Sequence, residues 1–157
     1  FSKHKAAEKG LFRLSQERRI IKGYIAVMPA GKVKNWMRVK ASLSFWGKAK
    51  IDPEGKTAET VFLKGERFGE FQCVRAVLRA GKRHQIRCHA SERLLPLLGD
   101  GLYGSLYKSQ SGRVGLMADR MNFSWMGSRY RFQIEEGMEI IRQWIEEDLH
   151  GVDKSSD

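Results

Sequence analysis

The chain has 157 residues, enough for one domain with a buried core and too few for two to be expected. Its 29 Lys and Arg residues against 18 Asp and Glu residues give a formal net charge of +11, which favours a polyanionic partner, nucleic acid before an anionic membrane. No apolar run approaches the roughly 20 residues that a membrane-spanning helix needs, and we expect neither a membrane partner nor a signal peptide.

The cysteine content bears on the compartment in which the protein works. Cys73 and Cys88 are the two cysteines of a lysine-rich sequence with no visible export signal. This usage favours free thiols in a reducing environment, and we expect a cytoplasmic protein.

The first predicted elements are a helix and a strand. Residues 2–19 carry a moderate apolar stripe among lysines and arginines, which predicts a helix. Residues 20–28 are rich in β-formers and are followed by Pro29, which predicts a strand. Basic residues in this region could follow an RNA backbone: Lys3, Lys5, Lys9, Arg13, Arg18, Arg19 and Lys22.

The middle of the chain is predicted to form strands joined by short turns. An alternation of apolar and polar residues over 36–51 predicts one strand with a buried face. A strand that opens after Gly55 and another over 71–78 flank a polar loop predicted at 65–69, as in a hairpin. We therefore expect mainly strand between residues 37 and 80.

The C-terminal part adds a second pair of strands and a helix. Short strands are predicted at 121–125 and 130–134, and residues 138–149 have the spacing of an amphipathic helix. The predicted fold class is α+β, a mixed, largely antiparallel β-sheet with a few peripheral helices. We expect residues 1–157 to form a single, partial domain with no separate RNA-binding domain.

Cationic, aromatic and glycine residues are most densely packed between residues 78 and 104. Gly81 ends a predicted strand and could adopt the positive-φ conformation that redirects the chain. Residues 83–94 then have helical spacing that places Arg87 in an early turn, and Pro96 follows the expected helix end.

This stretch closely resembles the most diagnostic motif of the RluA-type RNA pseudouridine synthases. Residues 81–89 read Gly-Lys-Arg-His-Gln-Ile-Arg-Cys-His, and residues 98–104 read Leu-Gly-Asp-Gly-Leu-Tyr-Gly. The family usually has arginine at the position of Lys82 and valine at that of Cys88, and both departures are mild.

Other segments resemble further motifs of this family in the family's order. Residues 22–24 resemble its lysine-x-tyrosine motif, and residues 55–60 its glycine-lysine-x-alanine-x-threonine motif. Residues 116–118 read Leu-Met-Ala where the family commonly has leucine-histidine-alanine. The family's histidine-arginine-leucine-aspartate motif, whose aspartate is the catalytic nucleophile, matches nothing in the 157 residues, and we expect it upstream of Phe1. Without that aspartate, the chain alone is expected to be inactive.

The resemblance implies isomerisation of specific uridines in structured RNA, ribosomal or transfer RNA, to pseudouridine. That reaction breaks a glycosidic bond and reattaches the same base through carbon, so no cofactor is expected. The base must leave the RNA stack to be reached. The site needs a carboxylate nucleophile, an opposite charge that keeps it ionised, and a flat side chain under the base.

By resemblance, Arg87 and Tyr24 are the catalytic residues that this chain supplies. A guanidinium group can fork onto a carboxylate as lysine cannot, and a tyrosine hydroxyl could assist proton removal. The expected RNA-binding residues are Lys22, Lys82, Arg83, His84 and Gln85. We also expect His84 and Gln85 to brace the turn through hydrogen bonds.

Plainer alternatives stay open. Taken alone, Arg87 could be a solvated or phosphate-facing charge, and Tyr24 could be half-buried packing. The spacing of His84, Cys88 and His89 fits a structural zinc site poorly, and no metal is expected. For the whole chain, the alternative is an inactive RNA-binding paralogue or fragment that lacks the nucleophile. A membrane-surface protein is disfavoured because no helix pairs a lysine-rich face with a strongly apolar one.

Overall fold

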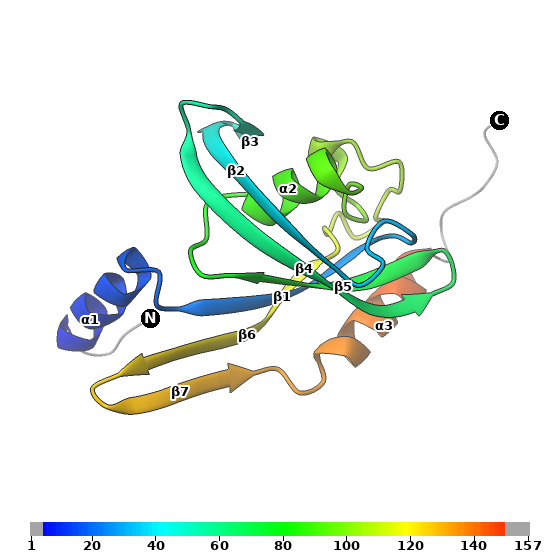
Figure 1. Ribbon diagram of the computed structural model, residues 1–157. Coiled ribbons are helices and arrows are strands. Elements are labelled where there is room, and N and C mark those ends of the chain that lie inside the picture. Colours follow the sequence, from blue (N-terminus) through cyan, green and yellow to red (C-terminus); the bar gives the residue numbers. More distant parts are fainter. Residues whose placement is uncertain (1–4, 150–157) are drawn as a thin grey trace.

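A computed structural model describes residues 5–149, which form a curved seven-stranded sheet with helices on both faces (Figure 1). The helices are α1 (Lys5–Gln16), α2 (Gln85–Arg93) and α3 (Gly137–Leu149), with a short 3-10 turn, η1 (Gly101–Tyr103). The strands are β1 (Ile21–Pro29), β2 (Trp36–Trp46), β3 (Lys48–Ile51), β4 (Lys56–Phe68), β5 (Phe71–Leu78), β6 (Leu116–Trp125) and β7 (Ser128–Gln133). Between residues 5 and 149, no helix has the length and apolar character to cross a membrane.

The strands lie in the order β3-β2-β4-β5-β1-β6-β7, and every pair of neighbours is antiparallel. Strand β1 lies in the interior of the sheet, because it pairs with β5 on one side and with β6 on the other. The predicted α+β class with a largely antiparallel sheet is confirmed, as is the expectation of mainly strand between residues 37 and 80.

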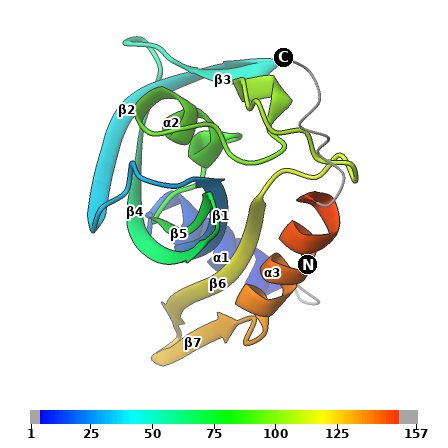
Figure 2. The same cartoon turned by 90° about the vertical axis from the view of Figure 1, so that its right-hand side faces the viewer.

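Strand β1 contributes to two separate core layers because its side chains alternate between the two faces of the sheet. Tyr24 and Ala26 pack in one hydrophobic cluster with Ile86 of α2, whereas Ile25 and Val27 pack in another cluster with residues of α3. The two helices therefore cover opposite faces, which we call the α2 face and the α3 face. Figure 2 shows the sheet curving around α2.

The turn before α2 corrects one detail of the prediction. Gly81 does not have a positive φ; instead, His84 adopts the left-handed conformation, with φ 55° and ψ 16°, and caps the start of α2. The Gln85 side-chain oxygen accepts the backbone N–H of Lys82 at 3.0 Å. The helix predicted over 83–94 thus begins at Gln85, and the expected bracing of this turn by Gln85 is confirmed.

Two glycines explain where the strand predictions were wrong. The strand predicted over 36–51 breaks at Gly47, whose φ of 70° turns the chain, so that β2 and β3 pair as a hairpin. The loop predicted at 65–69 is instead largely the end of β4. A Cβ at Gly65 would lie 2.4 Å from the carbonyl oxygen of Cys73 in β5, so the missing side chain lets the two strands approach.

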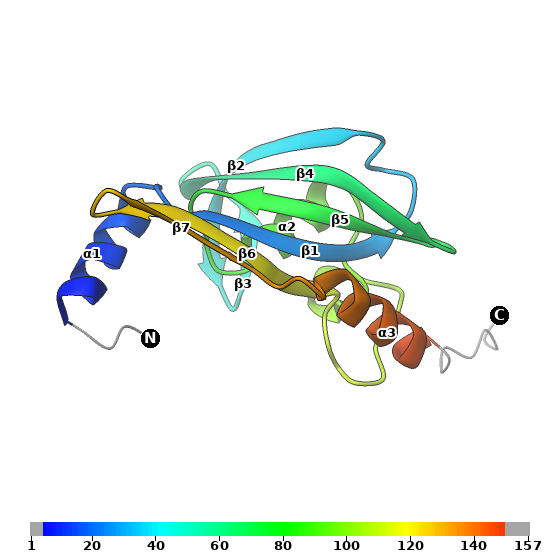
Figure 3. The same cartoon turned by 90° about the horizontal axis from the view of Figure 1, so that it is seen from below.

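The remaining elements follow the predictions with shifted bounds. Strand β6 begins at Leu116, earlier than the predicted segment 121–125, and β7 ends one residue before Ile134. Helix α1 lies at the tip of the β6–β7 hairpin (Figure 3), where a Cβ at Gly10 would come within 2.8 Å of the Trp125 indole nitrogen. The first helix was predicted to start at Ser2, and the first of the basic residues that could follow RNA is Lys3. Both residues lie outside the described part of the chain.

Candidate functional site

Arg87 lies at the centre of a group of hydrogen-bonded polar side chains. It lies in the first turn of α2, and its guanidinium group donates from Nε to Asp100 Oδ2 at 2.8 Å and from Nη2 to Asp100 Oδ1 at 2.6 Å. The Arg87 side chain is 17% exposed and that of Asp100 is 0% exposed. The bond to Asp100 raises the pKa of the Arg87 guanidinium above its ordinary value, so Arg87 stays charged at any working pH.

The remaining contacts of Arg87 run through His84 and Tyr103. Arg87 Nη1 lies 3.2 Å from His84 Nε2, and His84 Nδ1 lies 3.3 Å from the Tyr103 hydroxyl. The Tyr103 ring also covers a face of the guanidinium group, with Arg87 Cζ 5.0 Å from the ring centroid. Because Arg87 can only donate, His84 Nε2 must accept, and we assign the proton of the neutral ring to Nδ1.

His84 is kept neutral by its surroundings. Burial and the positive charges of Arg87 and Arg83 lower its pKa below the ordinary value, outweighing the opposite effect of Asp100. The Tyr103 hydroxyl completes the chain, because it accepts the backbone N–H of Ala49 at 2.8 Å and lies 3.2 Å from the Ala49 carbonyl oxygen. These bonds anchor the Arg87 group to strand β3, and they confirm that His84 braces the turn.

Tyr24 and Lys22 lie on the same side of the sheet as α2. Tyr24 is half-buried against the hydrophobic cluster that contains Ile86, and burial raises the pKa of its hydroxyl. The Lys22 ammonium nitrogen would lie 3.9 Å from a Cβ at Gly81, at the turn that leads into α2. Within residues 5–149 no hydrogen bond joins Tyr24 to Arg87, so the structure places both on the α2 face without direct contact.

Gln85 has a structural position that does not fit the predicted RNA contact. The residue is 2% exposed, and its side-chain amide nitrogen donates to the Glu59 carbonyl oxygen at 2.8 Å and to Thr60 Oγ1 at 2.9 Å. His89 Nδ1 also lies 2.9 Å from Thr60 Oγ1, and burial lowers the pKa of His89 to about 4. Gln85 and His89 therefore fasten α2 to β4 and do not face a ligand.

Lys82 and Arg83 are exposed and are available to a polyanion. Arg83 Cζ lies 4.4 Å from the centroid of the Phe45 ring, which holds the guanidinium group beside β2. A hollow of about 330 Å³ opens here, and its charged lining consists of Lys56, Lys82, Arg83 and a single acidic residue, Glu54. Its charge is positive overall, which suits a phosphate-bearing ligand.

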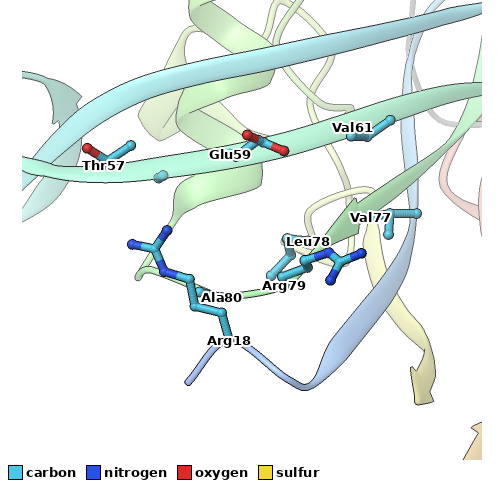
Figure 4. Close-up of a pocket in the computed structure, with 9 residues that line it drawn as sticks. Arg18, Thr57, Glu59, Val61, Val77, Leu78, Arg79 and Ala80 are labelled. Carbon is cyan, nitrogen blue, oxygen red and sulfur yellow. The ribbon is translucent and has the colours of Figure 1, made fainter. Parts of the chain in front are cut away.

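A second hollow, of about 210 Å³, lies on the opposite side of the sheet between β4 and the end of β5 (Figure 4). Arg18 and Arg79 line it together with Glu59 and Val61. Because Phe62 packs in the cluster of the α2 face and side chains alternate along a strand, Val61 belongs to the α3 face. The sheet therefore separates this hollow from Arg87.

Two of the basic residues near the N-terminus that could follow an RNA backbone form ion pairs within the protein. Arg13 Nε lies 2.7 Å from Glu17, and Arg19 Nη1 lies 3.2 Å from the same carboxylate. In the described part of the chain, no three His, Cys, Asp or Glu side chains are grouped so that they could hold a metal ion. His84 and His89 instead have separate protein partners.

The predicted site omitted two residues, Asp100 and Tyr103. Both lie in the Leu-Gly-Asp-Gly-Leu-Tyr-Gly segment, which follows the motif that contains Arg87. The presence of an acidic and an aromatic residue in this segment was the feature of the sequence that could have identified them. Asp100 itself is not placed to act as a nucleophile. Its carboxylate is fully buried and both of its oxygens accept bonds from Arg87, so a nucleotide base cannot reach it.

Parts of the chain are similar to known proteins. Residues 1–92 match the family model described as RNA pseudouridylate synthase. The ribosomal large subunit pseudouridine synthase D of Vibrio vulnificus is 42% identical over 62 residues, which cover 40% of this chain and 19% of the relative. The human pseudouridylate synthase RPUSD2 is 39% identical over 70 residues, which cover 44% of this chain and 13% of the relative. The matched segments thus span only a small part of these curated relatives.

Solved structures share the fold at low sequence identity. Human RNA pseudouridylate synthase domain containing 1 superposes with a TM-score of 0.69 and 21% identity, covering 84% of this chain and 61% of that one. Human RNA pseudouridylate synthase domain containing 4 superposes with the same TM-score at 16% identity, and the match covers 90% of this chain and 68% of that one. At these identities the likeness establishes a common fold.

Proposed function

Because the chain belongs to the RNA pseudouridylate synthase family, we propose that it forms part of the catalytic domain of an RNA pseudouridine synthase. In this isomerisation the N1–C1′ bond of a uridine breaks and a C5–C1′ bond forms, while C5 loses a proton and N1 gains one. Atoms and electrons balance within the nucleotide, so the reaction needs no external group donor or redox partner.

Arg87 carries the proposal, because it is a fixed cation that already has one buried partner and still has donors to spare. Its proposed task is to keep the nucleophilic aspartate of the upstream motif ionised and oriented. An opposite charge within hydrogen-bond distance favours the ionised form of a carboxylate. Lysine would supply the charge without the planar pair of donors.

Tyr24 is the proposed flat partner of the extruded base. It lies at the start of β1 on the α2 face, half-buried against the cluster that includes Ile86. A tyrosine hydroxyl is protonated at neutral pH, and burial raises its pKa further in Tyr24, so the ring can stack on a base without carrying a charge. The same hydroxyl is the proposed relay for the proton that C5 loses.

Lys22, Lys82 and Arg83 are the proposed phosphate contacts. They lie on and beside the turn that leads into α2, and the hollow next to Lys82 and Arg83 has a basic lining. We retain a supporting role for His84, through Arg87, and leave Gln85 out of the RNA-binding set because of its burial. Relatives named as ribosomal large subunit pseudouridine synthases favour ribosomal RNA over transfer RNA as the substrate.

The alternative is an inactive paralogue that binds structured RNA without modifying it. Modification mapping of total RNA from cells with and without the gene separates the two. We expect one or more pseudouridines, in ribosomal RNA, to disappear with the gene and to return when the gene is restored. An unchanged pseudouridine map, together with RNA binding by the purified protein, would favour the inactive paralogue.

A further inference from the structure

Arg87 has a limited number of donors, and the structure shows which ones are taken. A guanidinium group has five N–H bonds, one on Nε and two on each terminal nitrogen. Asp100 accepts the Nε hydrogen and one from Nη2, and His84 accepts one from Nη1. One hydrogen on Nη1 and one on Nη2 are left. The free Nη2 hydrogen lies on the terminal edge, because Asp100 takes the Nη2 hydrogen on the Nε side, and we assign it together with the free Nη1 hydrogen to an end-on carboxylate.

The surroundings restrict how another group can approach these two hydrogens. Asp100 occupies the Nε–Nη2 side of the guanidinium group, and the Tyr103 ring covers a face of it. The terminal Nη1–Nη2 edge is therefore the edge that can still take a second carboxylate with two parallel hydrogen bonds. A freely rotating arginine would offer its wider Nε–Nη2 edge as well.

The main chain around Asp100 is fixed as firmly as its side chain. Its N–H donates to the Leu97 carbonyl oxygen at 3.1 Å, and its own carbonyl oxygen accepts the N–H groups of Tyr103 and Ser105, each at 3.0 Å. The carboxylate thus projects from a rigid turn. The pair is buried and charge-assisted, so breaking it would leave the Asp100 carboxylate uncompensated.

The geometry points to Asp100 as the positioning residue for Arg87: a resident carboxylate that occupies one edge of the guanidinium group and presents the other edge to the catalytic aspartate. This inference rests on the proposed function. It adds that the site holds its arginine between two carboxylates, of which only the second takes part in the reaction. Asp100 is shielded from RNA and acts only through Arg87.

The test begins with a measurement that needs no variant. In the wild-type protein with ¹⁵N-labelled arginine, the Arg87 Nε–H should give a resolved NMR signal that exchanges slowly with water, because it is bonded to a buried carboxylate. Loss of that signal in Arg87→Lys assigns it. An Arg87 Nε–H that exchanges as fast as a solvated arginine overturns the inference, whatever the protein catalyses.

The second measurement links the orientation of Arg87 to turnover. At saturating RNA, Asp100→Asn in the complete protein should slow single-turnover pseudouridine formation by about 100-fold, the order of loss that small misplacements cause, and leave the RNA Kd within about twofold. Ile145→Ala, which weakens the buried core on the α3 face, serves as a control for lost stability and should keep near-wild-type turnover. Wild-type turnover in Asp100→Asn, or an equal loss in Ile145→Ala, contradicts the positioning role. A wild-type protein that makes no pseudouridine contradicts the proposed function, while the NMR measurement still decides how Arg87 is held.

Discussion

The hydroxyl group of Tyr103 accepts the backbone N–H of Ala49 at 2.8 Å, which ties the η1 turn to strand β3 across 54 positions of the sequence. The same hydroxyl lies 3.3 Å from His84 Nδ1, so this one oxygen connects the sheet to the residue that supports Arg87.

Tyr103→Phe should therefore weaken both the fold and the site. It leaves the Ala49 N–H and the His84 Nδ1–H without their acceptor, which we expect to lower the free energy of unfolding by about 1–2 kcal/mol and to slow turnover. Denaturant unfolding measures the first effect and single-turnover kinetics the second. Tyr107→Phe is the matched control, because that hydroxyl donates to the exposed Glu70 and its loss should cost less than about 0.5 kcal/mol. Equal effects of the two variants would contradict the prediction.

His89 should make the fold sensitive to acid. Burial lowers its folded-state pKa to about 4, whereas the unfolded chain takes up the proton near the ordinary value of about 6.5. Because the unfolded state binds the proton first, stability is lost as the pH falls from about 6.5 to about 4, by up to about 3 kcal/mol. His89→Gln removes the titrating group, so its unfolding free energy should fall less over that interval. Parallel pH profiles for the two proteins would show that His89 does not titrate in this way.

The close approach of β4 and β5 at Gly65 should not tolerate a side chain. In Gly65→Ala the new Cβ would meet the backbone oxygen of Cys73, which cannot move without disturbing the strand pairing, and we expect a loss of about 1–3 kcal/mol in the free energy of unfolding. Gly101→Ala is the control, because a Cβ there meets nothing within 4 Å. A Gly65→Ala protein as stable as Gly101→Ala would contradict the close approach of the two strands at Gly65 and Cys73.

RNA binding should depend on the basic turn before α2. Replacing Lys82 and Arg83 together by alanine should weaken RNA binding and reduce the slope of log Kd against log salt by roughly one to two, because two phosphate contacts are lost. The control replaces Lys32 and Lys34, two exposed lysines beyond the opposite end of β1 from Lys22. A salt slope that falls equally in both double variants would indicate diffuse attraction by the net charge and no contact at this turn.

The sequence predicted most of this architecture because the relevant signals are local. The alternation of side chains over β2, β4 and β5 has the period of a strand, and the spacing after Gly81 has the period of a helix. The strand predictions failed at Gly47, whose positive φ turns the chain, and at Gly65, which acts through a distant partner. Gly65 extends β4 because Cys73, in the next strand, needs the space of its missing side chain.

The site was predicted less completely for the same physical reason. The positions of Arg87 and Tyr24 followed from motifs, but the buried partner of Arg87 lies 13 positions away, beyond the end of α2, and the anchor of Tyr103 lies 54 positions away. No periodicity relates such pairs. Gln85 is a residue for which the motif suggested a contact that the structure does not favour. Its place in the motif suggested an RNA contact, whereas the residue is buried and its amide donates to the Glu59 carbonyl oxygen of β4.

Single-turnover pseudouridine formation by the complete protein and its Arg87→Lys and Arg67→Lys variants tests most directly whether Arg87 serves the catalytic carboxylate. Lysine keeps the charge but loses the fork that bonds Asp100 and a second carboxylate. A loss of about 2 kcal/mol in the transition state corresponds to a roughly thirtyfold slower reaction. Arg67, exposed and bonded through Nε to the Gly69 carbonyl oxygen, should tolerate lysine. We expect Arg87→Lys to be at least thirtyfold slower with nearly unchanged RNA affinity, and Arg67→Lys to match wild type. Near-wild-type turnover in Arg87→Lys, or a loss explained wholly by weaker RNA binding, would remove Arg87 from the active site.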